Sequence, residues 1–312
     1  MLRYRADLRS LSFIALDAVL VVGGWLVWPA LPWTARVPLI MTLAALSWLC
    51  AVITHNTLHS PMWRSRSLNR VTQVLLSTTY GFPVSEFVPG HNLSHHRYLQ
   101  TRRDVMRTSK VQFRWNVLNL LAFFFVVGFD VTAANQRYAK LTRPKNPRWF
   151  RQMLLEAAFV WGIKLAALAI DWRRALLLVI VPHLWAVWGI TTVNYLQHDG
   201  CDAEHEFNHS RNFVGRAFNW LTFNNGFHGM HHAQPALHWS LLADAHEKHI
   251  MPGLDPRLDE PSLAKYLWRA FVLPGRRVRF DGAPVKLLQE GPDDDWIQGA
   301  VAVDSTEPVG AS

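Results

Sequence analysis

Long apolar stretches alternate with polar segments along the first two thirds of the chain. Leu11–Leu31 and Val37–Thr54 are each close to the ~20 residues that cross the hydrocarbon of a bilayer, and a short turn joins them. Met153–Ile170 and Ala175–Leu196 form a second pair, joined at Asp171–Arg174. The pattern predicts four membrane-spanning helices arranged as two hairpins.

A further apolar stretch, Trp115–Ala134, has basic segments at both ends. Because basic loops stay on the cytoplasmic side of a membrane, we expect a surface-lying or re-entrant helix here. We expect interfacial or surface helices also at Leu68–Phe82, Trp239–Ile250 and Ser262–Leu273. The sequence therefore predicts an all-α integral membrane protein with four transmembrane helices, interfacial helices and a cytoplasmic histidine-rich cap.

Composition refines this picture. Residues 1–275 are expected to form one membrane catalytic domain, and the charged residues 276–312 a flexible tail whose last dozen residues are disordered. The formal net charge is +9, but no nucleic-acid motif accompanies it, so we assign the charge to membrane topology and to a docking surface. The two cysteines, Cys50 and Cys201, lie in an apolar run and a polar loop, which argues against a disulfide framework.

Nine of the 15 histidines lie in groups at or near the ends of apolar segments. They form the patterns HxxxH, HxxxHH and HxxHH, with a single histidine before the last pattern. These candidate metal ligands are His55, His59, His91, His95, His96, His198, His228, His231 and His232. Neutral imidazole is the commonest metal ligand in proteins, and ligation by nitrogen without thiolate suits iron, copper, nickel or zinc.

The number and spacing of these histidines indicate two metal ions. Residues three or four apart share one face of an α-helix. We therefore expect His91 to pair with His95 and His228 with His231, while the adjacent His96 and His232 point towards a second ion. Nine nitrogens are too many for one ion, since a tetrahedral site takes four ligands.

The series of histidine patterns after paired apolar helices resembles the membrane fatty acid desaturase and hydroxylase superfamily. The resemblance covers about Leu11–Leu242, and it accounts for the isolated His198 as an extra ligand. The stretches Asn194–Gly200 and His209–Asn212 are also similar to membrane alkane hydroxylases. The first pattern lacks their glutamate after His55, and the last pattern is closer to desaturases.

The resemblance implies a non-haem di-iron enzyme, with two iron ions as cofactor. It would use O2 and external electrons to desaturate or hydroxylate an unactivated C–H position of a fatty acyl or other lipid chain. Because the sequence has no haem, flavin or iron–sulfur motif, we expect an external donor such as a ferredoxin, rubredoxin or cytochrome. The basic stretches Arg97–Arg114 and Arg137–Arg151 could dock it. We expect the bacterial inner membrane, with both termini and the metal site in the cytoplasm.

Catalytic residues beyond the metal ligands are not evident from the sequence. Asn225, Asp199 and Glu204 are candidates for orienting the ligands by hydrogen bonds, and Asn225 is favoured because it precedes His228 by three residues. Two alternatives remain open: an alkane or carotenoid hydroxylase or ketolase, and a membrane metal transporter that relays cations through histidines. A transporter would place its ligands inside the spans, whereas these patterns lie at the ends of apolar runs.

Overall fold

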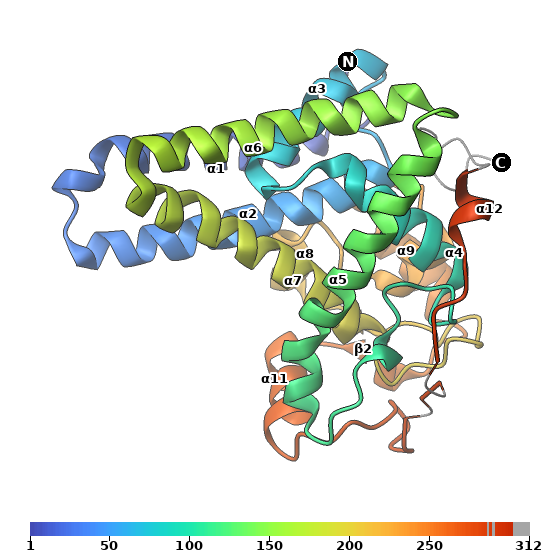
Figure 1. Cartoon of the computed structure of the whole chain (residues 1–312). Helices are drawn as coiled ribbons and strands as arrows, with labels where there is room; N and C mark the ends of the chain where they lie inside the picture. Colours follow the sequence, from blue (N-terminus) through green and yellow to red (C-terminus); the bar gives the residue numbers. More distant parts are fainter. Residues whose placement is uncertain (286, 289–290, 302–312) are drawn as a thin grey trace. The chain divides into compact units, whose positions relative to one another are not determined.

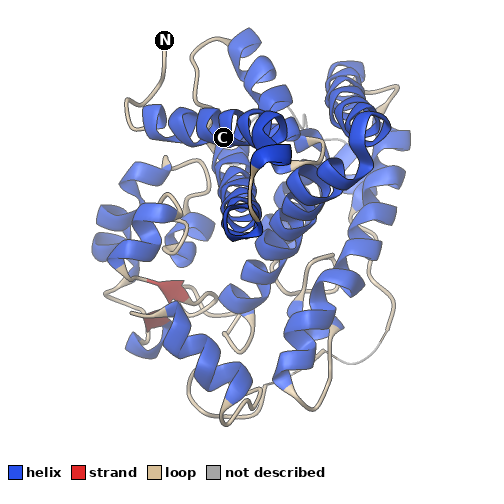
Figure 2. Cartoon of the chain, turned by 90° about the vertical axis from the view of Figure 1, so that its left-hand side faces the viewer, coloured by secondary structure: helices blue, strands red, loops and turns tan. Residues whose placement is uncertain are grey.

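The computed structural model describes residues 1–285, 287–288 and 291–301. Its contacts divide the chain into two compact units, each built from two segments. Unit 1 contains Met1–Phe87 and Asn146–Ile190, and unit 2 contains Val88–Lys145 and Thr191–Ser312. Helices dominate, and a two-stranded parallel sheet is the one sheet among the described residues (Figure 2). The all-α prediction is confirmed.

Unit 1 is built from long apolar helices (Figure 1). Its elements are α1 (Asp7–Val27), the 3-10 turn η1 (Trp28–Ala30), α2 (Trp33–His59), α3 (Arg66–Tyr80), the 3-10 turn η2 (Val84–Glu86), α6 (Pro147–Ala175), the π-helical η5 (Leu176–Ile180) and the first part of α7 (Val181–His198). α1 and α2 form one hairpin, while α6 and the η5–α7 segment form the other. These match the two predicted hairpins.

The second hairpin reverses at the predicted turn. Asp171 has a non-helical backbone, with φ −156° and ψ 97°, and its Oδ1 accepts hydrogen bonds from the backbone N–H groups of Arg173 and Arg174 at 3.0 and 3.1 Å. Arg174 Nη1 then donates to the carbonyl of Trp25 at 3.3 Å. The polar Asp171 thus ends one helix and caps the next, and Arg174 ties this turn to the end of α1.

Among the described residues, four stretches are long and apolar enough to cross a membrane: Asp7–Ala30, Trp33–His59, Asn116–Thr142 and Pro147–His198. The last has 52 residues, which at 1.5 Å per residue would extend about 78 Å as a straight helix, far more than a hydrocarbon core of about 30 Å. The reversal at Asp171 divides it into two lengths that each suffice for a crossing. The chain is therefore an integral membrane protein, as the apolar pattern predicted.

The third of these stretches bears on the predicted topology. α5 (Asn116–Thr142) is one continuous helix, so it contains no re-entrant turn. It also meets the length and hydropathy of a span. The surface-lying placement that its basic flanks indicate remains a prediction.

Unit 2 combines α5 with many short elements. These are the π-helix η3 (Val88–His95), α4 (His96–Tyr98), η4 (Thr108–Lys110), the end of α7, β1 (Asn212–Phe213), α8 (Arg216–Leu221), α9 (His228–Ala233), η6 (Trp239–Leu241), α10 (Leu242–Ala245), the π-helix η7 (His246–Ile250), η8 (Pro256–Leu258), β2 (Asp259–Glu260), α11 (Leu263–Leu267), the π-helix η9 (Trp268–Val272) and α12 (Ile297–Val301). The strands pair Asn212 with Asp259 and Phe213 with Glu260.

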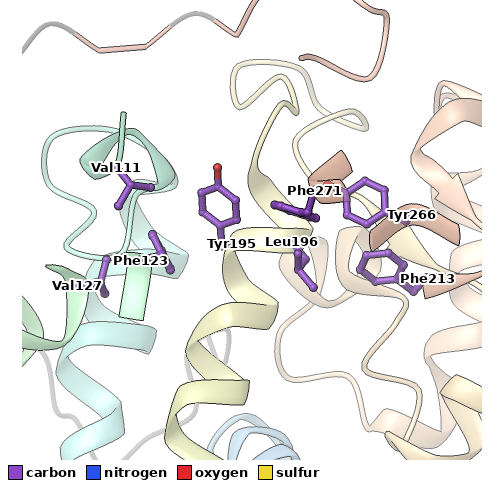
Figure 3. Close-up of a cluster of buried hydrophobic side chains, with 8 residues drawn as sticks. All are labelled: Val111, Phe123, Val127, Tyr195, Leu196, Phe213, Tyr266 and Phe271. Atoms are coloured by element: carbon purple, nitrogen blue, oxygen red, sulfur yellow. The ribbon is translucent and has the colours of Figure 1, made fainter. Parts of the chain in front are cut away.

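A buried hydrophobic cluster holds the core of unit 2 together (Figure 3). It contains Val111, Phe123, Val127, Tyr195, Leu196, Phe213, Tyr266 and Phe271. The cluster brings α5, the end of α7, β1 and the α11–η9 segment into one core. Tyr195 also donates through its hydroxyl to Asn116 Oδ1 at 3.0 Å. Because Tyr195 and Leu196 are fixed in this way, the position of His198, at the end of the same helix, is fixed too.

Part of the predicted tail is ordered. Arg277 forms a buried ion pair with Asp199, and Trp296, Ile297 and Val301 are buried. Of the last dozen residues, which we expected to be disordered, all but Val301 lie outside the described residues. The division between a catalytic domain 1–275 and a tail 276–312 remains a prediction.

Candidate metal centre

The first histidine pattern lies in the last turns of α2 in unit 1. His55 and His59 are four residues apart and buried, with ring centroids 5.3 Å apart in an edge-to-face arrangement. The helix ends directly afterwards, where the backbone N–H of Ser60 bonds to the carbonyl of Asn56 at 2.9 Å. One helix face therefore presents two imidazoles together.

The second pattern lies on the π-helix η3 and the start of α4, both in unit 2. A π-helix bonds residues five apart, so residues five positions apart come into line. Accordingly, His96 Nε2 lies 3.1 Å from His91 Nε2. The expected pairing of His91 with His95 is wrong, because that expectation assumed α-helical winding.

The third pattern begins α9, and two asparagines fix the chain that leads into it. Asn219 Nδ2 donates to the carbonyl of Phe213 at 2.7 Å, and its Oδ1 accepts the backbone N–H of Gly226 at 3.1 Å. A Cβ on Gly226 would lie 2.2 Å from the Phe213 carbonyl oxygen, so only glycine fits this close approach. Asn212 Oδ1 accepts the N–H of Gly229 at 2.8 Å, which holds the first turn of α9.

Four histidines of unit 2 form one compact group. Their candidate ligand atoms all lie within 4.8 Å of one another, and the residues are His95, His198, His228 and His232. His228 Nε2 faces His198 Nε2 at 2.8 Å, and the His232 ring lies 4.8 Å from that of His198. His228 and His232 share an α-helical face because they are four apart. The expected pairing of His228 with His231 is therefore also wrong.

Three more histidines form a second group in unit 2: His91, His96 and His231. His231 Nε2 lies 3.1 Å from His96 Nε2, which itself lies 3.1 Å from His91 Nε2. Unit 2 alone thus presents two separate sets of imidazole nitrogens, one of four and one of three. Each set could hold a metal ion.

A buried carboxylate orients His95. Asp104 Oδ2 lies 2.9 Å from His95 Nδ1, and both residues are 0 % exposed. The backbone N–H groups of Gln100 and Met106 donate to the same carboxylate at 2.9 and 2.8 Å. Burial alone would raise the pKa of Asp104, but the His95 ring and these hydrogen bonds bring it below its ordinary value.

This contact fixes the tautomer of His95. The carboxylate accepts the proton on Nδ1, so Nε2 carries the lone pair. That Nε2 is buried and has no hydrogen-bond partner among the described residues. A buried polar atom normally has a partner, so the unpaired nitrogen within a group of four imidazoles fits a metal ligand.

His198 and His232, in the same four-histidine group, also have features that suit an unprotonated metal ligand. His198 Nδ1 lies 3.2 Å from the carbonyl of His209, which leaves its Nε2 for the group. Burial and the neighbouring histidines lower the pKa of His232 well below its ordinary value, so this ring is neutral. Neutral imidazole is the form that binds metal.

A model of the fatty acid desaturase family matches residues 31–261, which include all nine histidines. The chain belongs to the fatty acid desaturase family. This confirms the resemblance. Desaturases are oxidoreductases that act on lipid substrates in membranes, and the chain is therefore an oxidoreductase of this kind. No curated protein gives a match to the chain.

The three residues expected to orient ligands occupy different positions in the structure. Asp199 is buried, and its carboxylate pairs with Arg277, whose Nη2 also donates to the carbonyl of Thr108 at 3.0 Å. Asn225 is buried and accepts a bond from Gln197 through its main-chain carbonyl at 2.9 Å. Glu204 lies exposed in the loop after α7. Their roles towards the metal remain predictions.

Three other residues position the histidines, and the sequence did not indicate them: Asp104, Asn212 and Asn219. Asp104 is the one acidic residue between Arg97 and Arg114, and this lone carboxylate nine residues after His95 was the available signal. The two asparagines precede the third pattern by more than eight residues. Nothing in their spacing distinguishes them from ordinary loop asparagines.

Proposed function

We propose that the protein is a di-iron fatty acyl desaturase or hydroxylase that uses O2 and electrons from an external donor. The observation that carries this proposal is the pair of histidine groups in unit 2, of four and three nitrogens, together with the Asp104–His95 contact. Iron bound in these groups would supply the oxidising chemistry with O2 that removes hydrogen from an unactivated C–H bond. The residues of the chain would hold, orient and shield the bound iron.

The two groups support two ions with different ligand sets. His95, His198, His228 and His232 would hold one iron, and His91, His96 and His231 would hold the other. We propose that His55 and His59 complete the second set, which gives four and five nitrogens. Their placement on one face of α2 and their position within the matched residues support this assignment.

The residues around the ligands have distinct tasks. Asp104 and the His209 carbonyl orient His95 and His198, so that both present an unprotonated Nε2. Asn212 and Asn219 hold the chain at the start of α9. The hydrophobic cluster around Tyr195 anchors the end of α7 and excludes water from that side of unit 2.

Iron analysis with paired variants tests the assignment. Protein made in iron-replete medium should contain about two iron ions per chain. His198→Ala and His96→Ala should each lower that number, because each removes a ligand from a different group, while the exposed His249→Ala should not. A stoichiometry of one in the unaltered protein, or zinc alone after iron loading, would contradict the di-iron proposal.

Lipid analysis separates desaturation from hydroxylation. Cells that express the active protein should accumulate an alkene or an alcohol in an acyl chain, and cells that express His198→Ala should not. Modification of an alkane or carotenoid instead would favour the alternative hydroxylase or ketolase. Exchangeable zinc or copper without any lipid product would favour a metal transporter.

A further inference from the structure

A basic surface on unit 2 carries an acidic segment of the same chain. The basic surface consists of Arg102, Arg107, Lys110 and Arg137. The segment Gly291–Asp295, which we name the acidic cover, runs across it and reads Gly-Pro-Asp-Asp-Asp. It directly precedes α12, the red helix in Figure 1.

Ion pairs join the acidic cover to the basic surface at several points. Asp293 pairs with Arg107 through Oδ1 and with Lys110 through Oδ2, the latter at 2.6 Å. Asp295 Oδ2 pairs with Arg137 Nη2 at 2.7 Å. The contacts therefore reach from the loop after the second histidine pattern to α5.

The main chain strengthens this contact. Arg102 Nη1 donates to the carbonyl of Pro292 at 3.3 Å, and the backbone N–H of Asp294 donates to the carbonyl of Arg102 at 3.1 Å. A groove of about 600 Å³ adjoins the segment and is lined by Arg107, Lys110 and Asp293, among others. The acidic cover thus lies on the basic surface without filling the space around it.

The acidic cover hides the cations that it contacts. The side chains of Arg107 and Lys110 are only 9 % and 5 % exposed, whereas that of Arg137 remains 52 % exposed. Asp130 on α5 also pairs with Lys110. Most of the positive charge of the basic surface is therefore already neutralised by carboxylates of the same chain.

The acidic cover is tethered beyond its C-terminal end. Trp296, Ile297 and Val301 are buried, and α12 packs against α5 and η3. Asp295 Oδ1 accepts the N–H of Ile297 at 3.0 Å and so caps this anchor. Because α12 anchors the segment, the carboxylates of the acidic cover stay at a high local concentration near the basic surface. Each partly exposed ion pair is weak by itself and is screened by salt. Separation of these ion pairs would therefore leave the buried contacts of α12 intact.

The basic surface is also close to the metal centre along the chain. The backbone N–H of Arg107 bonds to the carbonyl of Asp104 at 3.2 Å, and the Asp104 carboxylate bonds to His95. A partner bound at this surface would reach the centre through a short, buried connection. The surface is thus suited to a protein that delivers electrons.

We propose that the basic surface docks an acidic electron-donor protein and that the acidic cover competes with this donor for the same cations. The proposal rests on the function proposed above and adds a regulation to it. The contacts of the basic surface favour an acidic protein as partner, because the surface already binds carboxylates spaced along a polypeptide. Donor affinity should then depend on how firmly the acidic cover is held.

The test measures binding of an acidic [2Fe–2S] ferredoxin to full-length, iron-loaded protein in phosphatidylcholine nanodiscs. We expect Asp293→Asn with Asp295→Asn to bind the ferredoxin about three- to tenfold more tightly at low salt, because three ion pairs no longer compete. The gain should shrink as salt is raised. Asparagine at position 295 can still accept the N–H of Ile297, so the anchor is retained.

A matched control removes the same charge elsewhere. Asp244→Asn with Glu247→Gln neutralises two exposed acidic residues that lie outside the acidic cover. This variant should bind the ferredoxin as the unaltered protein does. Adding Arg137→Ala to the neutralised cover should weaken binding again, since that residue would then contact the donor.

Several outcomes would overturn the proposal. Equal gains in both double variants would assign the effect to net charge, and weaker binding by the neutralised cover would make that segment part of the docking site. No binding by any variant would rule out an acidic protein here. Ferredoxin binding that disappears when phosphatidylglycerol replaces phosphatidylcholine in the nanodiscs would assign the surface to anionic lipid. Because binding is read without turnover, a failure here is distinct from a failure of the oxygenase function, which iron content and lipid products report.

Discussion

The contact between Asp104 and His95 gives a sharp test of the metal centre through Asp104→Asn. Asp104 Oδ2 accepts from His95 Nδ1 and from the N–H of Gln100, while Oδ1 accepts from the N–H of Met106. An asparagine supplies only one oxygen. Its NH2 group must therefore face either the N–H of Met106 or the pair formed by His95 and Gln100.

The size of the effect follows from these bonds. If the amide NH2 faces His95, the ring shifts its proton to Nε2 and can no longer bind metal through that atom. If the amide oxygen faces His95 instead, the bond loses the charge of its acceptor, and hydrogen bonds to charged groups contribute ~1.5–3 kcal/mol. We expect iron affinity to fall by roughly 10–100-fold. This corresponds to about 1.4–2.7 kcal/mol.

Competition with a calibrated iron chelator measures this affinity. Glu260→Gln is the matched control, because Glu260 is also a buried carboxylate but pairs with Arg269. We expect it to lower the melting temperature of the protein, since a partly buried ion pair is weakened, and to change iron affinity little. Equal losses of affinity in the two variants, or full affinity in Asp104→Asn, would refute the orienting role of Asp104.

Three further predictions follow from the site and the topology. His198→Ala should abolish product formation while membrane insertion remains normal, whereas His249→Ala stays active; membrane fractionation and lipid analysis check both. In a chain without other reactive cysteines, a cysteine that replaces Trp172 should react with a membrane-impermeant thiol reagent on intact cells, whereas a cysteine that replaces Gln112 should not. The reverse pattern would contradict a cytoplasmic metal site. Burial, with His205 and His95 adding to it, lowers the pKa of His209 from 6.5 to about 4, so the unfolded chain takes up this proton first as the pH falls. The stability that neutral His209 provides should therefore be lost between about pH 6.5 and 4, and His209→Gln should show a shallower loss of melting temperature over that range.

Features that depend on residues close together in the sequence could be predicted, and features that depend on distant residues could not. The lengths of the apolar stretches and the spacing of the nine histidines can be recognised in short windows of sequence, so the hairpins and the family could be predicted. The pairing of His91 with His96 could not, because it depends on whether η3 winds as an α-helix or a π-helix. The grouping of His228 with His232 could not either, because residues three and four apart both share a helix face and spacing does not choose between His231 and His232. Asp104 and Asn212 also escaped prediction, since each acts through a bond to a residue at least nine positions away. The burial of Trp296 depends on packing in unit 2, and it was not predicted because the charged composition of residues 276–312 indicated a flexible tail.

The winding of η3 has a consequence for protein design. A designer who copied the string His-x-x-x-His-His onto an ideal α-helix would place its first two imidazoles on one face and the third on another. In this protein the π-helix aligns the first with the third, so that His91 and His96 face each other and His95 joins a different group. Deleting one residue from η3 upstream of His91 would leave every ligand in the chain. If that deletion restored α-helical winding, His91 would align with His95 instead of His96. The motif would then keep its sequence but present its histidines to the wrong metal sites.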